Sequence, residues 1–148
     1  MIRELLSYRL HEVANLLSRG AELRYRREFG VSLWEWRTLA LLGAATEPLS
    51  LSHLARAAGI HKSQMSRVVS GLARRKLVVR DANSEDARGV HLRLSRSGGK
   101  LYAGLIEAAA QRDRAFRGCL TREEKQAFDS ALAKLAGQAR TFIQQEKK

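Results

Sequence analysis

Residues 61–80, HKSQMSRVVSGLARRKLVVR, contain six lysines or arginines and no acidic residue. Four apolar residues nonetheless recur within them at the spacing of one helix face: Met65, Val68, Val69 and Leu72. A helix surface that faces only solvent usually carries glutamates mixed with its lysines. The stretch therefore predicts a helix that is buried on one side and basic and hydroxyl-rich on the other.

The second face of this helix carries side chains that suit DNA. Arginine can bind the major-groove edge of guanine with two hydrogen bonds, glutamine can do the same with adenine, and serine can bind a base or a phosphate. Small serines also let the helix backbone approach the groove closely. An ordinary solvated face is the alternative. We favour DNA contacts by Lys62, Ser63, Gln64, Ser66, Arg67, Ser70 and Arg74.

The charge of the whole chain agrees with an anionic partner. There are 27 lysines and arginines against 15 acidic residues, a formal net charge of +12. Such a field favours nucleic acid or an anionic membrane surface, with a merely solubilising excess as the alternative. No apolar run approaches the roughly 18 residues of a membrane span, so we expect a soluble protein without a membrane partner. A lone cysteine, Cys119, cannot close an internal disulfide, which favours the cytoplasm.

Capping signals mark where the other helices begin and end. An amphipathic pattern over residues 2–29 predicts the first helix, whose apolar stripe is wide enough to contact two surfaces. Ser32 and Thr121 are each followed three residues later by glutamate, which predicts capping boxes for the second and last helices. Ser50 precedes a short helix that stops at Gly59, directly before the basic helix.

After the basic helix, the sequence period changes to that of strands. Residues 77–80 and 90–94 predict a hairpin around a loop-rich segment, while TEPLS, residues 46–50, predicts a loop. The hairpin segment carries Asp86 and Arg88. An arginine at the hairpin tip can enter the minor groove, and a nearby aspartate can orient it. A polar turn with a weak surface ion pair explains these two residues equally well.

Two helices joined at a tight turn and followed by a hairpin form a winged helix-turn-helix. We expect one domain over residues 1–148 that is mainly α, with a small β-hairpin wing. The winged unit covers about 32–96, and residues 1–30 and 97–148 supply outer helices. In the last helix, apolar residues step by four, three, four and three, as in a coiled coil: Phe128, Leu132, Leu135, Ala139 and Phe142. Packing within one subunit or between two explains this stripe.

Several short motifs occur in a fixed order along the chain. The run LSLSHLARAAGIHKSQMSRVVSGLARRKLVVR is followed by the D-x-R of Asp86 and Arg88 and then by LRLSRSG. This order, over residues 10–135, resembles the MarR family of winged helix-turn-helix transcription regulators. In the family's pattern, Ser66 and Arg67 take the place of the serine–arginine pair in the recognition helix.

Three positions depart from the family's pattern. Lys76 occupies the place of a glycine, so a non-glycine residue would take a left-handed turn at a cost of about 1 kcal/mol. Ala87 stands where many members carry another arginine, which would weaken the wing's contact with DNA. Ser95 replaces a threonine, and both residues cap helices.

The resemblance implies an obligate homodimer whose N- and C-terminal helices interlock. It also implies binding to a pseudo-palindromic operator, usually as a repressor, and release by a small aromatic or lipophilic anion. A DNA-binding protein with an architectural or anti-silencing role, tolerant of sequence, is the alternative. The expected dimer contacts are Leu6, Leu10 and Val13 in the first helix and the stripe Phe128, Leu132, Leu135, Ala139 and Phe142 in the last.

The remaining residues indicate no further chemistry. The four histidines lie in different elements without metal-site spacing, and no phosphate loop or nucleophile motif occurs, so we expect no metal, cofactor or enzymatic activity. Trp34 and Trp36 could line an effector pocket, although core packing is the favoured interpretation. For Cys119, near the start of the last helix, an inert buried thiol is favoured over an activated one.

Overall fold

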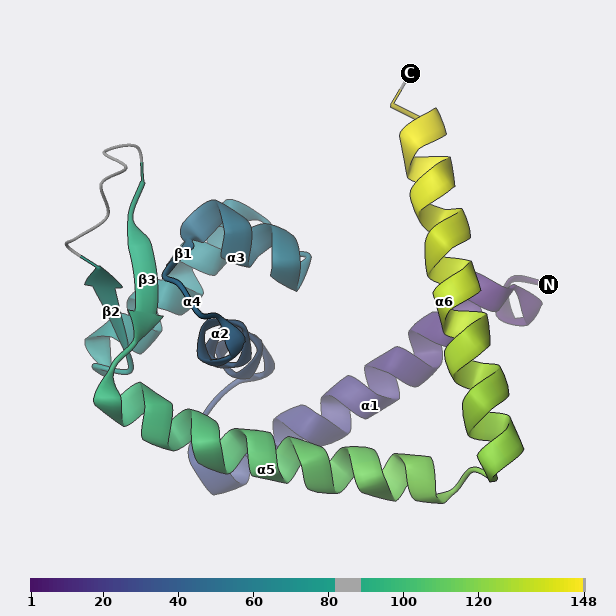
Figure 1. The fold of residues 1–148 in the computed structure, drawn as a ribbon, viewed down its shortest axis with the longest axis horizontal. Coiled ribbons are helices and arrows are strands. Elements are labelled where there is room, and N and C mark those ends of the chain that lie inside the picture. Colours follow the sequence, from purple (N-terminus) through teal and green to yellow (C-terminus); the bar gives the residue numbers. More distant parts are fainter. Residues whose placement is uncertain (82–88, 148) are drawn as a thin grey trace. The chain divides into compact units, whose positions relative to one another are not determined.

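The computed structural model describes residues 1–81 and 89–147, which are mainly helical (Figure 1). The elements in chain order are η1 (Ile2–Glu4), α1 (Leu6–Phe29), α2 (Leu33–Ala44), β1 (Leu49–Ser50), α3 (Leu51–Ala58), α4 (Lys62–Arg74), β2 (Val78–Asp81), β3 (His91–Leu94), α5 (Arg96–Gly118) and α6 (Arg122–Gln145). The expected fold class, helices with a small β wing, is confirmed. The chain divides into two compact units, Met1–Ala109 and Ala110–Lys148, with the boundary inside α5.

The predicted capping residues begin α2, α3 and α6. Ser32 Oγ accepts the Glu35 N–H at 3.2 Å, and Glu35 Oε2 accepts the Ser32 N–H at 2.8 Å, which completes a capping box. Thr121 forms the same box at the start of α6. Ser50 Oγ accepts the His53 N–H at 3.1 Å. These bonds satisfy amides that have no partner within the helix, and so they fix where each helix starts.

Left-handed backbone separates the elements of the first unit at three turns. Gly30 has φ 65° and Gly59 has φ 70°, as expected where glycine ends a helix. Lys76 has φ 57° and is the one non-glycine residue with positive φ among those described. The prediction that a non-glycine takes this turn is therefore confirmed.

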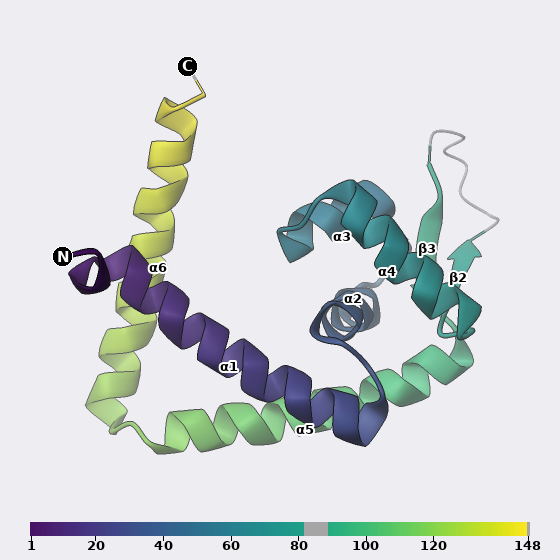
Figure 2. The same cartoon turned by 180° about the vertical axis from the view of Figure 1, so that it is seen from behind.

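The sheet has three antiparallel strands in the order β1–β3–β2. Val78 lies opposite Leu94, and the hairpin of β2 and β3 lies beside α4 in both views (Figures 1 and 2). The expectation of a simple loop at residues 46–50 was wrong, because Leu49 pairs with Leu92 and forms β1. A two-residue strand is too short to show alternation, and its partner is brought alongside only by the fold.

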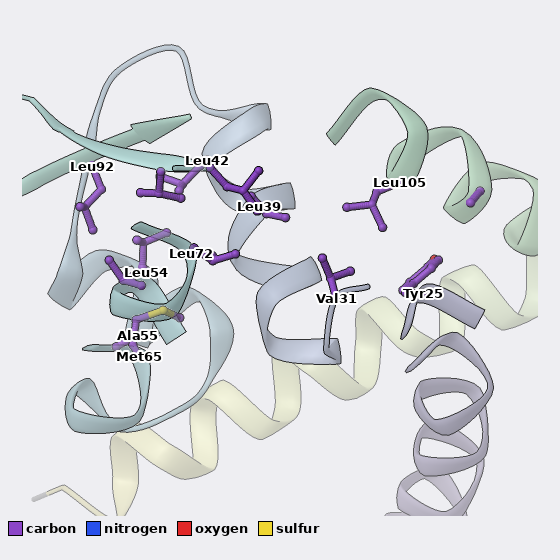
Figure 3. Packing of buried hydrophobic residues seen from close by; sticks show 14 residues of the cluster. Tyr25, Val31, Leu39, Leu42, Leu54, Ala55, Met65, Leu72, Leu92 and Leu105 are labelled. Atoms are coloured by element: carbon purple, nitrogen blue, oxygen red, sulfur yellow. The ribbon is translucent and has the colours of Figure 1, made fainter. Parts of the chain in front are cut away.

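The core of the first unit lies between α2, α3, α4 and the sheet. Leu39, Leu54, Met65 and Leu72 are fully buried, and Figure 3 shows them gathered in one interior with Leu92 of β3. Burying a side chain of this size contributes about 1.5–3 kcal/mol. The core therefore holds α4 against its neighbours and fixes which of its faces points outward.

The second unit consists of the last turns of α5, from Ala110 onward, and the whole of α6. Arg117 bonds to Asp113 Oδ2 through Nε at 3.1 Å and to Asp129 Oδ2 through Nη1 at 3.3 Å. The hydrogen bond and charge of Asp129, with the charge of Asp113, raise the pKa of Arg117 above its ordinary value. The pair with Asp129 joins the end of α5 to α6 across the turn between them, whereas the pair with Asp113 lies within α5.

Candidate nucleic-acid interface

Helix α4 buries the face that its apolar spacing predicted. Met65 and Leu72 are fully buried, Val69 is buried, and Val68 is partly buried against the same core. Because these residues fix the rotation of the helix, the side chains between them must point away from the core.

The opposite face of α4 is exposed to solvent. All seven residues expected to contact DNA lie on exposed positions: Lys62, Ser63, Gln64, Ser66, Arg67, Ser70 and Arg74. Within the described part of the chain, none of their side chains takes part in a hydrogen bond or ion pair. Helix α4 contains no acidic residue, so no side chain of the helix itself neutralises this charge. The face can accept an anionic partner without first breaking internal contacts.

Three residues beside this face, Ser50, Ser52 and His91, were not predicted from the sequence to belong to it. A hollow of about 430 Å³ is lined by Lys62, by Ser50 and Ser52 at the start of α3, and by His91 at the base of the hairpin. The register of β1 with β3 places Ser50 opposite His91. No sequence signal joins these residues, because only the unpredicted strand β1 brings them together.

The predicted wing residues Asp86 and Arg88 lie outside the described residues. Of the hairpin, the structure describes β2, β3 and the adjoining Gly89 and Val90, both of which are exposed. The minor-groove contact and its ion pair therefore stay predictions.

The two tryptophans of α2 have different surroundings. Trp36 packs against the core, with its ring centroid 5.3 Å from that of Tyr25. It also lines a pocket of about 420 Å³, together with Arg37 and small residues of α2 and α3. Trp34 is absent from this lining, and its ring lies 4.9 Å from the guanidinium carbon of Arg37.

The expected dimer residues leave apolar surface uncovered in the single chain. In α1, Leu6, Leu10 and Val13 are exposed, the last to 54%. In α6, Phe128, Leu132, Ala139 and Phe142 are exposed and Leu135 is partly buried. No described residue of α6 is buried. Packing within its own unit therefore does not cover the apolar stripe of α6.

Cys119 is exposed, which corrects the expectation of a buried thiol. It follows the last residue of α5, and its Sγ donates to the Phe116 carbonyl oxygen at 2.9 Å. In residues 1–81 and 89–147, no three histidine, cysteine or acidic side chains are grouped so as to hold a metal ion. No helix in the same ranges is long and apolar enough to cross a membrane.

Comparison with known proteins places the chain among DNA-binding regulators. The sequence model of the MarR family matches residues 29–89. The HTH-type transcriptional regulator FarR of Neisseria gonorrhoeae is 34% identical over 102 residues, which cover 69% of each chain.

Solved structures show the same fold. A MarR/EmrR family regulator from Acinetobacter sp. ADP1 has a TM-score of 0.82 and 25% identity, covering 91% of this chain and 94% of that one. A MarR family regulator from Silicibacter pomeroyi DSS-3 has a TM-score of 0.77 and 27% identity, over 91% and 98% of the two chains. MepR of S. aureus in complex with DNA is 21% identical with a TM-score of 0.82, also over 91% and 98%, and shares the fold.

Proposed function

Since the chain belongs to the MarR family of DNA-binding transcriptional regulators, a family of regulators rather than enzymes, we propose that it acts as a homodimeric repressor of a pseudo-palindromic operator. In this proposal each subunit places α4 (Lys62–Arg74) in one major groove. The wing of each subunit then contacts the adjacent minor groove through Arg88, with Asp86 orienting it.

The exposed face of α4 is the observation that carries the proposal. Seven polar side chains lie there without partners in the described structure, on a helix whose rotation is fixed by a buried opposite face. Arg67 and Gln64 can form base-specific hydrogen bonds, whereas Lys62 and the serines suit phosphates. A preorganised face of this kind favours sequence-specific binding over a merely electrostatic one.

The uncovered apolar surface supports the homodimer. One recognition helix contacts only a few base pairs, and two copies must lie about 34–36 Å apart to read both half-sites. Monomeric soluble proteins rarely leave large contiguous apolar patches exposed. The exposed apolar residues of α1 and the stripe of α6 are what a second copy would bury, as they lie outside the winged unit.

The pocket beside Trp36 supports control by a small effector. Its lining is mostly apolar, and Arg37 supplies one positive charge. A small aromatic or lipophilic anion matches that combination, because its ring would pack on Trp36 and its charge would face the guanidinium. Binding there would release the operator and relieve repression.

Competition at physiological salt tests the specific function against an architectural one. The wild-type protein selects duplexes from a random DNA pool, and each selected duplex is titrated beside a scrambled duplex of equal length. A specific regulator should prefer the selected duplex at least about a thousand-fold. Equal affinities that both collapse as salt rises would instead support the sequence-tolerant architectural protein.

The effector proposal has its own test. Salicylate, as an aromatic carboxylate probe, is titrated into the protein–operator complex while tryptophan fluorescence and DNA release are followed. Wild type and Trp34→Phe should both show a fluorescence change that tracks release, and Trp36→Phe should lose that change. Failure of a broad series of aromatic and lipophilic anions to release DNA would contradict this part of the proposal alone.

A further inference from the structure

The end of α4 is bonded to the start of α2. Arg75 directly follows α4, and its Nη1 donates to Glu35 Oε1 at 3.3 Å. The other carboxylate oxygen, Glu35 Oε2, accepts the Ser32 N–H at 2.8 Å. One carboxylate therefore serves both the capping box of α2 and the residue that follows α4.

Two glycines lie against this ion pair. A Cβ at Gly71, in α4, would lie 3.9 Å from Glu35 Oε1, and a Cβ at Gly30 would lie 3.9 Å from Arg75 Nη2. Gly30 is the left-handed residue that ends α1. The carboxylate thus lies against α4, and the guanidinium lies beside the turn from α1 to α2. The ion pair is located where these three helices meet.

The same end of α4 is also bonded to the start of α5. Ser95 Oγ donates to the Lys76 carbonyl oxygen at 2.6 Å, and the Ser95 N–H donates to the Leu77 carbonyl oxygen at 3.0 Å. The segment after α4 is therefore held on two sides. One contact, with Glu35, lies where the chain passes from α1 to the winged unit. The other, with Ser95, lies where the chain passes from the winged unit to α5.

We propose that Glu35 and Arg75 are positioning residues for DNA recognition. They fix the orientation of α4 relative to α1, and so the separation of the two copies of α4 in the dimer. Arg75 acts through Glu35 in this account rather than as another phosphate contact, because its guanidinium is already bonded to the carboxylate. The inference rests on the proposed homodimer and its two half-sites.

The substitution Glu35→Gln separates positioning from simple electrostatics. Its amide oxygen can still accept the Ser32 N–H, but the carboxylate that holds Arg75 is gone. Removing a negative charge from the protein would, by electrostatics alone, strengthen binding to every DNA sequence. Loss of positioning has a different effect: it weakens the preference of the dimer for an operator with the correct half-site spacing.

The experiment uses three versions of a duplex selected by the wild-type dimer: the original, and versions with one base pair added or removed at the centre of the dyad. Glu35→Gln and Arg75→Gln should each lower the preference for the original spacing, by up to about five-fold per half-site for a partly exposed ion pair. The double variant should lose no more than the larger single loss, because the two residues act as a pair. Binding of Glu35→Gln to scrambled DNA should be unchanged or slightly tighter.

The outcomes distinguish failure of the two-half-site proposal from failure of the positioning role of Glu35 and Arg75. Wild type that binds all three spacings equally would contradict the two-half-site proposal, and the inference would be overturned with it. Wild type that prefers one spacing, with variants that keep that preference in full, would overturn the positioning role alone, even if the variants were less stable. Thermal unfolding confirms that each variant is folded, and the more exposed Arg75→Gln provides the test if Glu35→Gln does not fold.

Discussion

The hydroxyl of Ser95 donates a hydrogen bond to the carbonyl oxygen of Lys76 at 2.6 Å. Lys76 is the left-handed residue after α4, and Ser95 directly precedes α5. Ser95 Oγ also accepts the Gly98 N–H at 2.9 Å, so one hydroxyl both caps α5 and binds the turn. This contact joins the proposed recognition helix to the helix that leaves the winged unit.

Gly98 must remain glycine for this contact to form. A Cβ at Gly98 would overlap the Leu77 carbonyl oxygen, which belongs to the backbone and cannot move aside cheaply. We expect Gly98→Ala to lower the free energy of unfolding by about 3 kcal/mol, as severe overpacking does. Its neighbour Gly99 provides the control, since a Cβ there meets nothing within 4 Å. Gly99→Ala should be neutral or stabilising by up to about 1 kcal/mol. Equal losses of stability in urea denaturation would contradict this account of the α4–α5 contact.

Lys76 stores backbone strain that a glycine would remove. A residue with a Cβ costs about 1–2 kcal/mol in the left-handed region, and φ is 57° here. We therefore expect Lys76→Gly to stabilise the folded protein by about 1 kcal/mol, after the greater flexibility of glycine in the unfolded chain is counted. Lys76→Ala removes the same side-chain charge but keeps the Cβ, and it should bring no such gain. Thermal denaturation of both variants beside wild type makes the comparison. A gain of equal size in both would assign the effect to charge instead of strain.

The proposed dimer predicts that charges in the α6 stripe abolish assembly and operator binding together. Leu132→Glu with Leu135→Glu would place two carboxylates in the interface, where an unpaired charge costs several kcal/mol of desolvation. Gln126→Glu with Gln144→Glu adds the same charge on the opposite side of α6, where both residues are exposed, and should keep the dimer. Sedimentation and operator titration on one preparation give both readouts. A folded monomer of the leucine variant that still binds the full operator tightly at physiological salt would refute the proposed dimer.

Local signals account for what could be predicted from the sequence. The capping boxes at Ser32 and Thr121 depend on residues three positions apart, and the buried face of α4 depends on residues three or four positions apart. Both patterns can therefore be recognised in the sequence. Strand β1 could not be predicted in this way, because Leu49 pairs with Leu92, a residue far away in the sequence that only the folded chain brings alongside. The hollow beside His91 could not be predicted for the same reason, because the pairing of β1 with β3 places Ser50 opposite His91.

The exposure of Cys119 shows a second limit. An inert buried thiol was favoured over one activated by the nearby start of the last helix, yet Cys119 is exposed in the turn that follows α5. The Glu35–Arg75 ion pair was missed for a related reason. Glu35 had already been assigned to its capping box, and no pattern indicates that its other oxygen reaches a residue 40 positions away.

The most direct test of the account is the affinity of Arg67→Ala for operator and for scrambled DNA at physiological salt. Arg67 is on the exposed face of α4, where a two-bond contact to a base would carry discrimination. Base recognition by Arg67 predicts a loss of about 1–3 kcal/mol in the binding free energy for the operator and a much smaller loss for scrambled DNA. Lys62→Ala, which removes a proposed phosphate contact, should weaken both duplexes by similar amounts. Equal losses on both duplexes for Arg67→Ala would contradict base recognition by this helix.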